Sequence, residues 1–482
     1  MKIPHIYLIA ALFVSVPISA CADLIVLNYH DVVPNPGNDR FAVSRAMFVA
    51  HMDYLQQNGY RPISLLSLQE AITKHTPLPE KTVLLTFDDG LKSYREFVVP
   101  MLEIYQFPSV VSLVTAWLDG IDVPSEYRGK IMSWNDARQI TAARLVSLVS
   151  HTNNLHQGIL ANSRGNQRGA AITRQFFPAT QSFEDETQFR ARVRRDLMLS
   201  SSRMQQELTR RPHAVAWPYG EYDEVVLAEA RALGMNLHFV LSDSDNSDLA
   251  QGVVGRTLVV DRPDVETFAK LLTQSRAQVP RHFAELSLDA YVGKTEAEQE
   301  VLLSDTLERL ASLHVNAVIV SPVSADGKRA FFTTRGSTTT ADVLDRVVHQ
   351  IRTRLNIRHV VLRLPSNLHV KDERIFFEDL ARLTRFNALL FTSDISADRL
   401  KIVREVVTRY RPHIIYGAFG DVPRSAEFDF FLVSSVGFQD IENVDPARLW
   451  VTVSDVRDER ALRERVAQLG AQGVINYGVP LE

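Results

Sequence analysis

This chain of 482 residues has a single cysteine, Cys21, and so cannot form an internal disulfide. Its net charge at pH 7 is only −4, and nothing in it suggests internal repeats or low-complexity segments. The mild charge gives no support for nucleic acid as a partner, because that partner requires a basic face. Hydrophobic residues make up 45% and charged residues 23% of the chain, as in ordinary globular proteins. This length allows two or three domains, each with its own core.

Two adjacent carboxylates, Asp88 and Asp89, follow the apolar run Val83–Leu85 and directly precede Gly90. The apolar run predicts a short buried strand, and the end of such a strand is where an α/β protein displays its chemistry. Burying two adjacent acids is costly unless a metal ion or hydrogen-bond donors receive them. A metal held by one Asp would leave the other as a base. The alternative is a solvated Asp-Asp-Gly turn, which is the commoner case for this motif taken alone.

A pair of histidines, His151 and His156, follows the apolar stretch Leu145–Ser150. Two histidines in one short loop after a strand can direct their imidazole nitrogens at the same ion. With one Asp they form a two-histidine, one-carboxylate set, which leaves coordination positions open for water and substrate. Two unrelated surface histidines are the alternative.

Two further motifs lie at predicted strand ends. The run Leu24–Val32 contains Tyr-His-Asp, and His30 in that position would suit a general acid or a hydrogen-bonded structural histidine. The turn Trp217-Pro218-Tyr219-Gly220 follows Ala214–Ala216. It would either form the wall of a sugar pocket and direct a backbone N–H at an oxyanion, or be a packed turn.

Together these motifs resemble the NodB-type polysaccharide deacetylases, carbohydrate esterase family 4. The resemblance implies that Asp88 is the catalytic base and that Asp89, His151 and His156 hold a divalent metal, whether zinc, nickel, cobalt or iron. A Tyr-His-Asp strand ahead of the Asp-Asp motif is a circularly permuted order. That order is similar to the poly-β-1,6-N-acetyl-D-glucosamine N-deacetylases of biofilm exopolysaccharide systems, which implies a general-acid role for His30.

The resemblance also implies the reaction, hydrolysis of an N-acetyl amide that releases acetate without a covalent intermediate. The Tyr219 backbone N–H would stabilise the oxyanion, and Trp217 and Pro218 would lie at the substrate in the same turn. The implied partners are an N-acetylglucosamine polysaccharide and an outer-membrane exopolysaccharide porin. A non-catalytic polysaccharide-binding or export adaptor is the alternative from another class, and peptidoglycan or another N-acetylated glycan is an alternative substrate.

Alternating strand-like and amphipathic runs predict an α/β protein with two domains after the N-terminal segment. Residues 23–278 are expected to form the deacetylase domain, a distorted (β/α) barrel with seven strands in the family it resembles. Residues 280–482 are expected to form a second, shortened (β/α) barrel-like domain, similar to a degenerate glycoside hydrolase. Asp289 and Asp394 are its candidate glycan-binding acids, and glycoside hydrolysis by this half is a competing function.

The N-terminus carries an apolar run, Ile6–Val16, that predicts a secretory signal peptide and is too short to span a bilayer. The sequence Ile18–Cys21 is similar to a bacterial lipobox, in which Cys21 would be lipidated and anchor the protein to a membrane. That interpretation predicts a lipoprotein signal over residues 1–20 and a periplasmic protein on the outer membrane. Ordinary cleavage after Ala22, with a signal over residues 1–22, is the alternative.

Overall fold

The computed structural model describes residues 24–163, 165–241, 249–274, 282–355, 357, 359–420, 428–434, 449–452 and 476–481. The chain divides into two compact units. The first contains the segments up to Leu113, Val123–Val149 and Leu237–Leu272; the second contains Val114–Asp122, Ser150–Asn236 and the segments from Thr273 onward. The signal segment with Cys21 and the expected domain boundary at 278–280 lie outside the described residues.

The first barrel is a sheet with the strand order β1-β14-β13-β12-β7-β6-β5-β4, closed by an additional pairing between β1 and β5. Its strands are β1 (Ile25–Tyr29), β4 (Arg61–Pro62), β5 (Thr82–Phe87), β6 (Ser109–Leu113), β7 (Val146–Ser150), β12 (Ala214–Ala216), β13 (Leu237–Leu241) and β14 (Val253–Leu258). Seven of them close the ring, and β4 pairs only with the start of β5. The expected seven-stranded barrel is confirmed.

Strands β1 and β5 carry the first two motifs. Every residue of both strands is buried, which explains why they appear as continuous apolar runs in the sequence. They pair in parallel with Tyr29 opposite Phe87, and the two rings stack at 5.4 Å between centroids. Because the strands are parallel and in this register, His30 and Asp88 both follow at the same edge.

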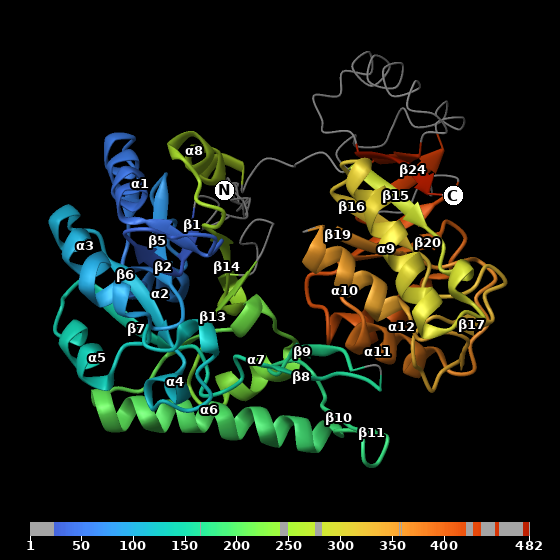
Figure 1. Ribbon diagram of the computed structural model, residues 1–482, viewed down its shortest axis with the longest axis horizontal. Coiled ribbons are helices and arrows are strands. Elements are labelled where there is room, and N and C mark those ends of the chain that lie inside the picture. Colours follow the sequence, from blue (N-terminus) through green and yellow to red (C-terminus); the bar gives the residue numbers. More distant parts are fainter. Residues whose placement is uncertain are drawn as a thin grey trace, which may run out of the picture. The chain divides into compact units, whose positions relative to one another are not determined.

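Helices connect these strands: α1 (Arg45–Gln57), α2 (Leu65–Lys74), α3 (Val99–Tyr105), α4 (Thr115–Leu118), α5 (Trp134–Thr141), α6 (Glu186–Leu208), α7 (Glu224–Arg231) and α8 (Val265–Gln274). Figure 1 shows α1 and α3 beside β5 and β6. Most begin with side-chain caps, such as Ser44 on α1 and a reciprocal Asp185–Gln188 capping box on α6. Short pieces complete this half: β2 (Asp31–Val33), β3 (Ala42–Ser44), the π-helix Tyr94–Val98, and single 3₁₀ turns at Ser125–Tyr127, Pro218–Gly220 and Leu249–Gln251.

The polar segment between β7 and α6 forms two hairpins. The antiparallel pair β8 (Gly158–Leu160) and β9 (Gln167–Gly169) is followed by β10 (Phe176–Phe177) and β11 (Ser182–Phe183). Arg168 and Asn166 are buried despite their polarity. This segment is therefore partly packed, with buried residues such as Asn166 and Arg168 and exposed residues such as Gln167 and 178–182.

The second barrel is closed by eight parallel strands: β15 (His282–Leu286), β16 (Ala317–Val320), β19 (His359–Arg363), β20 (Ala388–Thr392), β21 (Ile415–Phe419), β22 (Phe430–Ser434), β23 (Leu449–Thr452) and β24 (Asn476–Leu481). Figure 1 shows its helices around the strands: α9 (Glu296–Ser312), α10 (Leu344–Arg354), α11 (Glu373–Leu383) and α12 (Ala397–Thr408). Two short strands, β17 (Arg329–Ala330) and β18 (Thr338–Thr339), pair outside the barrel, and Asp289–Tyr291 is a 3₁₀ turn.

The predicted second (β/α) barrel is confirmed, and its ring has the full eight strands of a (β/α)₈ barrel although the domain is short. Inside the ring, Phe283, Phe430 and Trp450 pack together, with centroids 4.8 to 5.6 Å apart for the pairs that involve Trp450. A larger apolar cluster lies between the strands and the helices. Among the described residues, no helix combines the length and apolar character needed to cross a membrane.

Candidate active site

The carboxylate of Asp88 lies buried at the end of β5 and accepts hydrogen bonds from the side chains of Ser112, Arg256 and Asn28. Ser112 Oγ donates to Asp88 Oδ1 at 2.6 Å and Arg256 Nη1 donates to the same oxygen at 2.7 Å, while Asn28 Nδ2 donates to Oδ2 at 2.9 Å. The Asn28 side-chain oxygen accepts from Arg256 and from Thr86, which fixes its amide with the NH₂ toward Asp88. The Arg256 guanidinium, itself 2% exposed, stabilises the ionised carboxylate inside the protein.

The neighbouring carboxylate, Asp89, is buried and faces a tyrosine that sequence reasoning did not identify. Burial, and then the negative charge of Asp89 and a hydrogen bond to it, raises the pKa of Tyr127 far above its ordinary value. Tyr127 therefore stays protonated at all physiological pH values. A protonated hydroxyl beside Asp89 favours the ionised form of this carboxylate, which is the form that serves as a metal ligand.

The two histidines and Asp89 come together as the sequence predicts. One ligand atom from each of Asp89, His151 and His156 lies within 4.8 Å of the other two. The buried His151 ring has Nδ1 at 2.7 Å from the Ala216 carbonyl oxygen. A carbonyl only accepts, so Nδ1 carries the proton and Nε2 keeps its lone pair for a metal. The His156 ring lies 4.9 Å from that of His151.

The loop between the two histidines is held by a buried carboxylate on α6. Asp196 accepts hydrogen bonds from the backbone N–H groups of Asn153 at 2.8 Å and Asn154 at 2.7 Å. Burial raises the pKa of Asp196 to about 6, and the two N–H donors act in the opposite direction. At neutral pH the ionised carboxylate therefore accepts both bonds and fixes the spacing of the histidines.

Replacing Asp196 by Asn is expected to weaken metal binding about 10- to 100-fold, the range found when groups that support metal ligands are changed. An amide offers one acceptor and places an NH₂ donor against one of the two backbone N–H groups. Titration of the metal-free protein by calorimetry measures the effect. The control is Asp185→Asn, at the exposed N-cap of the same helix, where Asn caps as well as Asp. Equal affinities in both variants would show that Asp196 does not hold the loop.

Three loops of the site each contain a residue with positive φ. Asp89 has φ 72°, Thr152 φ 69° and Tyr219 φ 59°, a region that non-glycine residues seldom occupy. Thr152 is β-branched, so its conformation is the most strained of the three. Such strain is stored where the surrounding structure requires a specific geometry, typically at functional sites.

His30 is half-buried at the end of β1, and its ring lies 5.1 Å from that of Phe41. Its Nδ1 is buried and has no hydrogen-bond partner within the described part of the chain. A half-buried imidazole held by ring packing can exchange a proton with a substrate group through its other nitrogen, Nε2.

The residues of the turn after β12 differ in how far they are exposed to solvent. Trp217 is fully buried and Pro218 is buried, so neither presents a ring face to solvent. Tyr219 is 47% exposed, and its ring lies 4.8 Å from that of His156. Of the three residues predicted to contact a substrate, Tyr219 alone offers an exposed ring surface beside the metal-ligand candidates.

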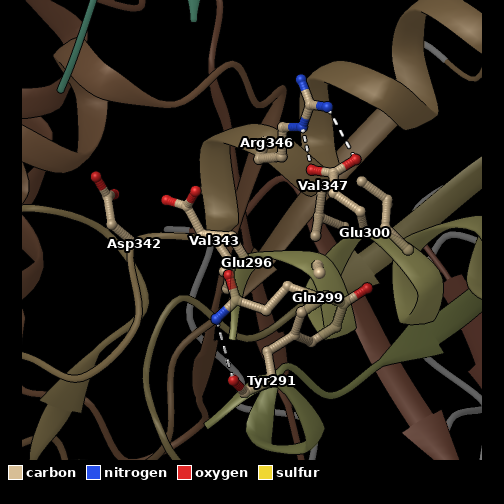
Figure 2. Close-up of a pocket in the computed structure, with 10 residues that line it drawn as sticks. Tyr291, Glu296, Gln299, Glu300, Asp342, Val343, Arg346 and Val347 are labelled. Atoms are coloured by element: carbon tan, nitrogen blue, oxygen red, sulfur yellow. Dashed lines mark hydrogen bonds and ion pairs between the residues drawn. The ribbon is translucent and has the colours of Figure 1, made fainter. Parts of the chain in front are cut away.

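The predicted acids of the second barrel, Asp289 and Asp394, are both exposed, and Asp289 accepts a hydrogen bond from Ser287 Oγ at 2.9 Å. A cavity of about 270 Å³ lies between α9 and α10 of this barrel. Figure 2 shows Arg346 forming a two-point ion pair with Glu300 there, with both N–O distances 2.9 Å. Arg346 and Glu300 therefore already neutralise each other. No histidine lines this cavity, so it offers no set of metal ligands like that of Asp89, His151 and His156.

The chain is similar to several known proteins. A family model described as polysaccharide deacetylase matches residues 75–238. The chain is 27% identical over 349 residues to the poly-β-1,6-N-acetyl-D-glucosamine N-deacetylase of Escherichia coli, a match that covers 69% of this chain and 52% of that enzyme. The chain thus spans about half the length of that relative.

Two solved structures are also similar. A de-N-acetylase from Aggregatibacter actinomycetemcomitans is 29% identical with a TM-score of 0.48, and the match covers 52% of this chain and 99% of that one. The BpsB deacetylase domain from Bordetella bronchiseptica is 30% identical with a TM-score of 0.43, and the match covers 49% of this chain and 95% of that one.

Proposed function

We propose that the chain removes N-acetyl groups from poly-β-1,6-N-acetyl-D-glucosamine, releasing acetate, through the barrel that contains residues 75–238, the segment matched by the polysaccharide deacetylase family model. The observation that carries this proposal is the cluster of Asp89, His151 and His156 next to the separately hydrogen-bonded carboxylate of Asp88. Metal-dependent amide hydrolysis requires a set of metal ligands and a separate general base. The adjacent residues Asp89 and Asp88 would supply one of the ligands and the base.

The residues fit a divalent metal. Asp89 supplies a buried oxygen, and the tautomer fixed by Ala216 leaves His151 Nε2 to coordinate. Two histidines and one carboxylate suit zinc, nickel, cobalt or iron. When bound, the ion would polarise the amide carbonyl and lower the pKa of a water.

The side chains of this protein then supply the proton transfers. Asp88, held by Ser112, Asn28 and Arg256, takes a proton from the attacking water. His30, at the same edge of the paired strands, gives a proton to the departing amine. The Tyr219 backbone N–H is our proposed donor to the oxyanion of the tetrahedral intermediate. Hydrolysis needs no nucleophilic serine or cysteine.

The substrate assignment rests on the permuted order of the motifs and on the similarity to the E. coli N-deacetylase of this polymer. To test it, acetate release is measured from β-1,6-linked N-acetylglucosamine oligomers, chitin oligomers and peptidoglycan fragments, using protein that lacks residues 1–22. We expect release from the β-1,6-linked oligomers to be much the fastest. Faster release from chitin or peptidoglycan would reassign the substrate, and binding without release would favour the adaptor function.

We also propose that the protein is exported to the periplasm, anchored to the outer membrane through a lipidated Cys21, and works with an exopolysaccharide porin. The apolar run and the Ile18–Cys21 sequence support export and lipidation. Replacing Cys21 by Ser should move the protein from the membrane fraction to the soluble periplasmic fraction. An unchanged distribution would favour cleavage after Ala22.

A further inference from the structure

The β8–β9 hairpin is anchored to the second barrel through a buried arginine. Arg168 on β9 pairs with Asp345 on α10, and the two side chains are only 5% and 7% exposed. Arg168 Nη1 also donates to the Arg382 carbonyl oxygen at 2.9 Å, and Asn166 Nδ2 donates to Asp345 Oδ2 at 3.0 Å. The Asp345 carboxylate therefore accepts hydrogen bonds from two side chains of the hairpin, those of Arg168 and Asn166. Its negative charge also pairs with the buried guanidinium of Arg168.

The residue after Arg168 packs against the turn of the proposed active site. A Cβ added to Gly169 would lie 3.0 Å from Tyr219 Cδ2 and 2.8 Å from Glu221 Oε2. The hairpin backbone therefore touches both the Tyr219 ring and the side chain of Glu221. Glu221 in turn pairs with Arg385, which follows α11. Two ion pairs to the second barrel thus involve residues at this contact: Arg168 precedes Gly169 and pairs with Asp345, and Glu221 faces Gly169 and pairs with Arg385.

Tyr219 connects this contact to the metal-ligand candidates. Its ring lies 4.8 Å from that of His156, and its backbone is held at φ 59°. A residue in that conformation needs support from its surroundings, because the chain would otherwise relax to a commoner backbone state. Gly169 supplies close packing on one side of the ring.

We propose that Asp345, acting through Arg168 and Gly169, is a positioning residue for Tyr219, so that the second barrel sets the geometry of the deacetylase turn. This inference rests on the proposed deacetylase function for its kinetic readout, but not for its structural one. It gives the second barrel a role in catalysis that requires no glycan-cleaving acids of its own.

The first test replaces Asp345 by Asn, which keeps the shape of the side chain and removes its charge. We expect kcat for acetate release to fall about 10- to 100-fold, as when reacting groups are displaced by about 1 Å, while metal affinity stays unchanged. Hydrogen–deuterium exchange should become faster in residues 165–170 and 217–222. The control is Arg346→Gln, the next residue on α10, because its ion pair with Glu300, drawn in Figure 2, is partly exposed.

A second pair of variants acts from the other side of the contact. Gly169→Ala inserts a methyl group between the hairpin and Tyr219, and should lower kcat as Asp345→Asn does. Gly158→Ala is the matched control, because Gly158 pairs with Gly169 in the hairpin but its added methyl group would meet only the exposed side chain of Gln167. If Asp345→Asn fails to fold, the comparison of Gly169→Ala with Gly158→Ala tests the proposal instead.

The outcomes separate this inference from the proposed function. Unchanged kcat in Asp345→Asn and Gly169→Ala, in an active enzyme, would overturn the inference and leave the deacetylase intact. If the wild-type protein releases no acetate from any glycan, the exchange data decide alone. Faster exchange of residues 217–222 in Asp345→Asn than in Arg346→Gln supports the inference, and equal exchange overturns it.

Discussion

Asp88→Asn protein is expected to release acetate about 10²- to 10⁴-fold more slowly than the wild type, while binding the metal equally well. An amide cannot take a proton from water, yet its oxygen still accepts from Ser112 and Arg256. The variant should be less stable than the wild type, because the buried Arg256 loses its anion and the Asn28 amide faces a second NH₂ group, so activity is compared on folded protein. The metal ligands are separate residues, which is why affinity should not change.

Both quantities are measured on the same preparation, kcat by acetate release and affinity by calorimetric titration of the metal-free protein. The matched control is Asp89→Asn, which should lose affinity together with activity because Asp89 is the expected ligand. If Asp88→Asn retained near-full activity, or if it lost the metal, the division of roles between the two adjacent acids would be wrong.

Arg256→Gln is expected to lower the free energy of unfolding by about 3 to 5 kcal/mol, because it leaves the buried Asp88 carboxylate without its cation. The double variant Asp88→Asn/Arg256→Gln should recover part of this loss, since neither charge then remains buried. Equilibrium unfolding in urea, without metal, is measured for the wild type, Asp88→Asn, Arg256→Gln and the double variant, and the four values give the coupling free energy from the cycle.

The control for this cycle is Arg346→Gln, which breaks the partly exposed pair with Glu300 and should cost no more than about 1 kcal/mol. A double variant less stable than Arg256→Gln alone would contradict the account. In that case Arg256 would contribute through packing of its side chain rather than through the charge of Asp88.

Sequence reasoning located the strands that present the motifs because they are continuous apolar runs. Val83–Leu85 lies inside β5, Leu145–Ser150 contains β7, and Ala214–Ala216 is β12. In a parallel barrel both faces of a strand are buried, so such runs stand out from their polar surroundings. Since parallel strands end at one edge, Asp89, His151 and His156 could be predicted to meet.

Sequence reasoning missed the groups that orient these residues. Arg256 alone among them could have been identified from the sequence. It is a single arginine within the apolar run Val253–Leu258, and an arginine buried with such a strand needs a carboxylate partner. Tyr127 and Asp196 had no such signal, because each reaches the site from a segment remote in the sequence. The packing of Arg168 on Asp345 joins residues 177 positions apart, which no local pattern encodes.

The measurement that tests the central claim most directly is a metal titration of acetate release. Protein lacking residues 1–22 is stripped with a chelator and assayed with β-1,6-linked N-acetylglucosamine oligomers while zinc, nickel, cobalt or iron is added in steps. We predict no activity without metal, recovery that saturates near one ion per chain, and no recovery in His151→Ala protein. Full activity in the stripped protein, or equal recovery in His151→Ala, would contradict a metal-dependent deacetylase at this site.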